Sequence, residues 1–141
     1  WICGMKEHVV RLKPGEDLLE AISSYCSKHV IEAAYIGTCV GSLSTVTFRK
    51  GYTKTQMTLR GTYEIVSAVG TLSKGGHHIH MSVSDSDFQV LGGHIDRNTV
   101  VLTTVELVLI ELESFELVRT IDATTGYKTL VVNDARSKSS S

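Results

Sequence analysis

The 141-residue chain has a single proline, few aromatic residues (6%) and no dominant charge. Its 14 Lys and Arg residues nearly balance 15 Asp and Glu, for a formal net charge of −1. Binding to a phosphate backbone needs a clustered basic surface, so this balance predicts no direct contact with nucleic acid. A run of about 18 apolar residues is also lacking, so we expect no membrane-spanning helix.

Cysteine is scarce as well. Cys3, Cys26 and Cys39 are odd in number and show no CxxC spacing, which is typical of reduced thiols in an intracellular protein. We therefore expect a cytoplasmic protein. The chain opens on Trp1 rather than on methionine, so we also expect that a leader or other upstream residues have been removed.

Hydrophobic residues make up 42% of the chain and charged residues 21%, enough apolar content for one globular domain with its own core. We expect this single domain to span residues 1–134. Residues 135–141 form a Ser/Lys tail that is poor in apolar side chains, and we expect them to be disordered.

Strand patterns outnumber helical patterns along the chain. One helix is predicted after Glu16 and Asp17, where Leu18, Ile22 and Cys26 recur at helical spacing. Alternating or β-branched segments predict strands, with Gly37 and Gly41 as turn residues, at 5–12, 32–40, 44–49, 62–72, 98–112, 115–121 and 126–132.

These elements predict an α+β fold, in which a largely antiparallel, twisted sheet is covered on one face by the helix. The segments 32–40 and 44–49 are expected to form a tight strand pair, and 62–72 is expected to lie beside the following histidine-rich segment. The segment 98–112 is too apolar for an exposed strand. At least one of its faces must be buried, in the core or against another subunit.

Histidine is concentrated in one stretch, residues 75–95, which holds four of the six histidines in the chain. His78 and His80 alternate with apolar residues, so in a strand both imidazoles project from one face. A three-residue loop at 86–88 would set His94 opposite His80. An even loop would turn His94 to the other face unless a bulge at Gly92-Gly93 corrected the register.

In the odd-loop register, His78, His80 and His94 could converge on one metal ion, with Cβ separations of about 5–7 Å. Three neutral imidazole nitrogens suit zinc best, while nickel or copper is possible. His77 projects to the opposite face and is expected to be a surface or supporting group. Asp85 and Asp87 follow on the loop, where they are either a candidate base or, as we favour, ordinary turn residues.

The motifs His78-Ile79-His80, Ser82-Val83-Ser84-Asp85 and Leu91-Gly92-Gly93-His94-Ile95 resemble the PPC domain (plants and prokaryotes conserved), a family described as being of unknown function. Its hallmark is a Pro-His-x-His strand followed by Gly-Gly-His-Leu. This chain departs from that pattern at His77 and Ile95. The resemblance extends over nearly the whole chain and implies the same fold, assembled as a homotrimer.

Two functions from different classes are open at this point. In the first, the three histidines hold zinc with one position free for a small-molecule ligand, and whether the site is catalytic is undecided. In the second, the chain is a regulatory protein–protein interaction module linked to DNA-binding or transcription partners. Plant members carry a separate AT-hook that contacts DNA, and this chain has no such motif, so it would not bind DNA itself.

Overall fold

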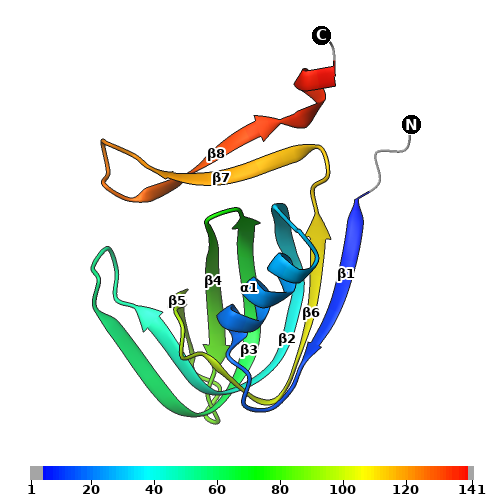
Figure 1. Ribbon diagram of the computed structural model, residues 1–141. Coiled ribbons are helices and arrows are strands. Elements are labelled where there is room, and N and C mark those ends of the chain that lie inside the picture. Colours follow the sequence, from blue (N-terminus) through cyan, green and yellow to red (C-terminus); the bar gives the residue numbers. More distant parts are fainter. Residues whose placement is uncertain (1–4, 140–141) are drawn as a thin grey trace.

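Strands supply most of the fold, as the alternating patterns predict. The computed structural model describes residues 5–139 (Figure 1). In chain order the elements are β1 (Lys6–Leu12), α1 (Leu18–Lys28), β2 (Ala33–Arg49), β3 (Gln56–Ser73), β4 (Gly76–Ser84), β5 (Val90–His94), β6 (Val100–Glu111), β7 (Phe115–Ile121), β8 (Lys128–Asp134) and the 3-10 helix η1 (Ala135–Ser139).

An antiparallel sheet of six strands, in the order β1-β6-β2-β3-β4-β5, forms the body of the molecule, and β7 and β8 pair separately as a hairpin. Helix α1 covers one face of the sheet (Figure 1). The predicted α+β class is therefore confirmed. Most of the apolar segment 98–112 forms β6, an interior strand between β1 and β2, so its buried face belongs to the core of this chain.

Helix α1 begins where the sequence predicts. Asp17 is its N-cap, and its Oδ1 accepts the backbone N–H of Glu20 at 3.0 Å. The other carboxylate oxygen of Asp17 accepts the N–H of Asn98 at 2.6 Å, which ties the start of the helix to the start of β6. The stripe of Leu18, Ile22 and Cys26 is buried against the sheet.

Strand β2 corrects one prediction. Residues 32–40 and 44–49 were expected to be two strands joined at a turn, but Ala33–Arg49 is one continuous strand. Gly41 lies inside it, at a shift in the β2–β6 register, and a Cβ there would collide with the Thr104 carbonyl oxygen. A glycine inside a strand can mark such a close backbone approach as well as a turn. Gly37 also lies within β2 and not at a turn.

The two faces of the sheet differ in composition. We call the covered side the helix face; it contributes Ile79, Met81, Val83, Leu107 and Leu109 to the core. The opposite side is the outer face. Paired residues of neighbouring antiparallel strands share a face, so the row Ile110, Tyr35, Thr71, His78 runs across this outer face through four strands.

The β7–β8 hairpin lies across one end of the sheet (Figure 1). Its first strand is attached through Lys74, whose N–H donates to the Leu117 carbonyl at 3.0 Å. At the other end of the hairpin, the Tyr127 hydroxyl donates to the Tyr52 carbonyl oxygen at 2.7 Å, and Tyr52 belongs to the β2–β3 connection. Contacts at both ends of the hairpin therefore join it to the rest of the chain.

The C-terminal segment and two of the cysteines can be compared with what the sequence predicts. Ala135–Ser139 form η1 inside the segment predicted to be disordered, while residues 140–141 lie outside the described part. Cys26 and Cys39 are free and buried, and burial raises their pKa to about 11 and about 12. Cys3 also lies outside the described residues.

None of the helices in the described part of the chain has the length and apolar character that a membrane span requires.

Candidate metal centre

Strands β4 and β5 bring the predicted histidines together. His80 pairs with His94 in a register that continues without a shift to Ser84 and Val90. The turn is closed by the Asp85 N–H, which donates to the Gln89 carbonyl at 3.0 Å. The odd-loop register is thus confirmed, and no bulge at the Gly92-Gly93 pair is needed to place His94 on the outer face.

His78, His80 and His94 form a compact cluster whose candidate ligand atoms all lie within 4.8 Å of one another. The Nε2 atoms of His78 and His80 are 3.1 Å apart. Zinc–nitrogen bonds of about 2.0–2.1 Å in a tetrahedral site correspond to nitrogen separations of about 3.3–3.4 Å. One pair is therefore already near the separation that zinc requires.

The surroundings of the cluster favour neutral imidazoles. Burial lowers the pKa of His94 to about 4, and the Arg49 guanidinium adds to the shift while Asp96 opposes it. Burial also lowers the pKa of His78, with His80, Arg119 and Arg49 contributing in the same direction. Only a neutral imidazole has a lone pair for a metal, so these shifts favour the ligand form.

His94 has one ring nitrogen without a protein partner in the part of the chain that the structure describes. Its Nδ1 atom is buried and has no hydrogen-bond partner among the described residues. An unpaired buried polar atom costs free energy, and native structures contain few of them. A metal ion is one partner that would satisfy such a nitrogen, so the residues present fit a transition metal.

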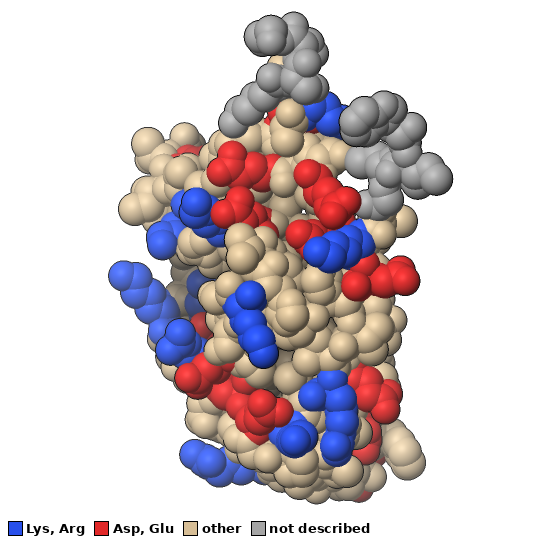
Figure 2. Space-filling view, turned by 45° about the vertical axis from the view of Figure 1, so that its right-hand side comes forward, with Lys and Arg blue, Asp and Glu red and all other residues tan. Residues whose placement is uncertain are grey.

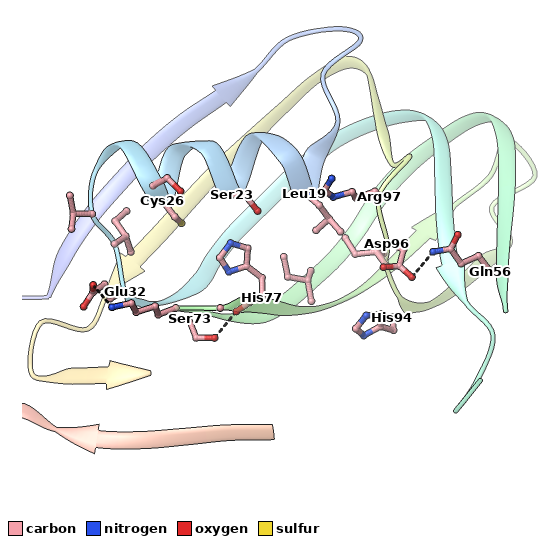
Figure 3. Close-up of a pocket in the computed structure, with 18 residues that line it drawn as sticks. Leu19, Ser23, Cys26, Glu32, Gln56, Ser73, His77, His94, Asp96 and Arg97 are labelled. Carbon is pink, nitrogen blue, oxygen red and sulfur yellow. Dashed lines mark hydrogen bonds and ion pairs between the residues drawn. The ribbon is translucent and has the colours of Figure 1, made fainter. Parts of the chain in front are cut away.

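His77 is outside the three-histidine cluster, although it also lines the cavity around those histidines. It pairs with Leu72 and is half-buried, and burial followed by the charge of Arg119 lowers its pKa. It also lines a cavity of about 650 Å³ between α1 and the sheet, where Figure 3 shows its ring below Cys26 and Ser23. The structure separates His77 from the ligand set, as expected, but His77 is not a plain surface residue.

The acidic residues considered as helpers are not at the cluster. Asp85 Oδ1 accepts the N–H groups of Asp87 and Gln89, each at 2.9 Å, so Asp85 closes the β4–β5 turn. Four strand residues, about 13 Å, separate this turn from His80. Neither Asp85 nor Asp87 lines the cavity around the histidines.

That cavity, which we call the histidine cleft, has a volume of about 890 Å³. Its walls come from the end of β2, from β4 and β5, and from the β7–β8 hairpin. Besides the histidines it is lined by Arg49, Arg119, Tyr127 and Lys128. These four residues could not be predicted from the sequence, because each comes from a segment at least about 25 positions from the nearest of the three histidines and carries no motif of its own.

The Gly-Gly pair before His94 has a packing role. A Cβ at Gly92 would collide with the Met81 carbonyl oxygen and lie 2.9 Å from the Ser82 Cα, both on β4. A Cβ at Gly93 would meet only the Phe48 ring, at 3.9 Å. Gly92 therefore permits the close approach of β5 to β4 that holds His94 beside His80.

Residues 3–113 of the chain match the Plants and Prokaryotes Conserved (PCC) domain, the family written PPC above. The chain belongs to this family. The matched residues contain the whole six-stranded sheet described above and all three histidines of the cluster, whereas the β7–β8 hairpin lies beyond them. The histidine cleft of this PCC-domain protein is thus built partly by the matched residues and partly by a segment outside them.

Solved structures share the fold of this PCC-domain chain. A hypothetical protein from Salmonella cholerae-suis is 33% identical, with a TM-score of 0.89 over 94% of this chain and 96% of the other. A PPC protein from Pyrococcus horikoshii is 26% identical, with a TM-score of 0.79 over 91% and 93%. A metal-containing protein from Archaeoglobus fulgidus is 24% identical, with a TM-score of 0.74 over 89% and 93%.

Sequence relatives include a much longer protein. The chain is 30% and 32% identical over 123 residues to the bifunctional protein GlmU of two Synechococcus strains, JA-3-3Ab and JA-2-3B'a(2-13). Each match covers 87% of this PCC-domain chain but 20% of GlmU. The chain thus spans about a fifth of the length of these relatives.

Proposed function

We propose that this PCC-domain protein binds one transition-metal ion, zinc, through His78, His80 and His94. The observation that carries the proposal is the cluster itself: three imidazoles from paired strands, with ligand atoms within 4.8 Å. The metal-containing protein from Archaeoglobus fulgidus, which has the same fold, lends support. Three protein ligands leave a fourth position for water or a small molecule, as in catalytic zinc sites, whereas structural sites usually have four protein ligands.

Elemental analysis of protein purified without a His-tag tests the proposal. We expect about one zinc per chain, and none in His80→Ala, because two remaining imidazoles hold zinc poorly. The matched control is His77→Ala, which removes a neighbouring imidazole outside the cluster and should keep the metal. Absence of any transition metal, or equal metal content in the two variants, would refute the proposed site.

We further propose that the chain assembles as a homotrimer through the outer face. Val9, Val40 and Val69 are 77%, 47% and 64% exposed on this face. Exposed apolar side chains on one face of a sheet can belong to a contact site, and the number three comes from the family resemblance. Light scattering coupled to size-exclusion chromatography should give a trimer mass for the wild type and a lower mass for Val9→Asp. Val30→Asp, at a similarly exposed valine in the turn after α1, is the control.

The same face favours a second candidate function, a regulatory interaction module that joins DNA-binding partners without contacting DNA. The formal net charge of the chain is −1, and on a different side of the molecule, the one seen in Figure 2, Lys and Arg are interspersed with Asp and Glu and form no basic track. We expect no appreciable binding to duplex DNA at physiological salt in a fluorescence anisotropy assay. Sub-micromolar binding with a steep salt dependence would contradict this expectation.

A further inference from the structure

The histidine cleft carries charge of one sign. Arg49, Arg119 and Lys128 line it, and no Asp or Glu is among the described residues that do so. This is unusual for a chain whose basic and acidic residues number 14 and 15. Clefts lined by one sign of charge concentrate ligands of the opposite sign.

Both arginine side chains have hydrogen-bond donors without a partner among the described residues. The side chain of Arg49 makes no hydrogen bond or ion pair among the described residues, and its Nε is buried. The Nε of Arg119 is also buried and unpaired, while its Nη2 donates to Thr71 Oγ1 at 2.9 Å, which orients the guanidinium. Buried donors of a charged group are costly unless an acceptor meets them, and anionic oxygens are the acceptors that guanidinium groups bind best.

Both guanidinium groups belong to the same cleft as the histidines. Arg49, at the end of β2, and Arg119, in β7, line it together with His78, His80 and His94. Three neutral imidazoles do not offset the charge of a divalent ion. With the metal bound, the cleft would hold a dication beside two or three side-chain cations, and an anionic ligand would balance them.

The size of the cleft indicates an organic molecule. A volume of about 890 Å³ exceeds what one inorganic ion fills and lies in the range of small-molecule sites. Tyr127 forms part of the wall and is held by its hydrogen bond to the Tyr52 carbonyl. A ligand could therefore place its anionic group between the metal and the arginines and an uncharged part against Tyr127.

We infer that the metal site takes a small organic anion with a carboxylate or phosphate group, and that Arg49 and Arg119 bind the anionic oxygens. This inference rests on the proposed metal site and adds the class of its ligand. It assigns to the β7–β8 hairpin, through Arg119, a part in ligand binding.

Side-chain NMR of the arginines tests the inference directly. Zinc-loaded protein is titrated with inorganic phosphate and with acetate, and the Nε–H resonances, assigned by substitution, are followed. We expect those of Arg49 and Arg119 to shift in a saturable way, and acetamide, the neutral analogue of acetate, to have no effect. Arg49→Gln and Arg119→Gln should each weaken phosphate binding about 10- to 100-fold. Arg60→Gln, at an exposed arginine outside the cleft, should leave it unchanged.

Zinc content is measured on every variant, so that failure of the proposed metal site can be distinguished from failure of the proposed anion binding. Full zinc content with no saturable shift, or equal phosphate affinity in Arg49→Gln, Arg119→Gln and wild type, overturns the anion inference and leaves the metal site standing. If the wild type holds no metal, the metal site fails. The same titration of metal-free protein then decides: phosphate binding that both arginine variants lose supports the anion site, and no binding refutes it.

Discussion

The nine residues of strand β4 alternate between the two faces of the sheet, and the side chains on the two faces differ in kind. Ile79, Met81 and Val83 point to the helix face and are 2%, 3% and 0% exposed, whereas His78 and His80 point to the outer face and are exposed. The apolar set packs into the core under α1. The histidines instead border the cleft that also contains Arg49 and Arg119.

The difference indicates that stability and ligand binding are divided between the faces. A domain of this length has enough buried apolar surface to fold without a metal, because metal-dependent folding belongs mostly to shorter chains. The outer face can then carry polar and exposed groups at little cost to the fold. Substitutions on the two faces of the same strand should therefore have different consequences.

The largest expected effect is on the helix face. Ile79→Ala should lower the free energy of unfolding by about 2–5 kcal/mol, because it leaves a cavity in a close-packed core. His80→Ala, the next residue on the same strand, should change it by less than about 1 kcal/mol in metal-free protein. Urea denaturation with a chelator present measures both. Equal losses for the two variants would mean that the faces are not separable.

The next largest effect is expected at Gly92, in the Gly-Gly pair before His94. Gly92→Ala should destabilise the protein by about 1–3 kcal/mol, because the new methyl group meets the β4 backbone and must push β5 away. Zinc affinity should fall as well, since His94 moves with β5. Gly93→Ala is the matched control and should be close to wild type in both urea denaturation and zinc titration. A stable Gly92→Ala with normal zinc affinity would contradict the packing role.

The double variant His78→Asn with His94→Asn tests the outer face alone. We expect it to bind no metal yet to remain folded and assembled, with a melting temperature only a few degrees lower, corresponding to ~1–2 kcal/mol. Calorimetry and light scattering on the same sample measure both properties. A variant that does not fold, or that falls apart into monomers, would show that the histidines are structural.

The last prediction concerns pH. His94 titrates near pH 6.5 when unfolded and has a pKa of about 4 when folded, so between these values the unfolded chain binds a proton that the folded protein does not. The stability of metal-free protein should therefore decrease as the pH falls through this range. The lowered pKa of His78 acts in the same direction. Urea midpoints between about pH 7 and pH 5 should decrease less in His94→Asn than in wild type.

Local pairing explains why part of the site could be predicted. His78 and His80 are two residues apart, and His94 follows after one short turn, so alternation and loop parity alone place the three on one face. Helix α1 was predictable for a similar reason, because its N-cap at Asp17 and its apolar stripe are contiguous in sequence. The turn predicted at Gly41 was wrong because, in sequence, a glycine at a turn cannot be distinguished from a glycine at a close backbone approach within a strand.

The sequence by itself thus determined the fold class, the family motifs and the histidine cluster, all of which depend on short-range periodicity and on one hairpin. Only the tertiary structure decided what surrounds the cluster. Arg49 reaches it from the end of β2 and Arg119 from β7, after chain reversals whose geometry depends on bulges and on the packing of a separate hairpin. Residues far apart in sequence have no mutual spacing rule, because their contact is set by the energy of the whole packed chain.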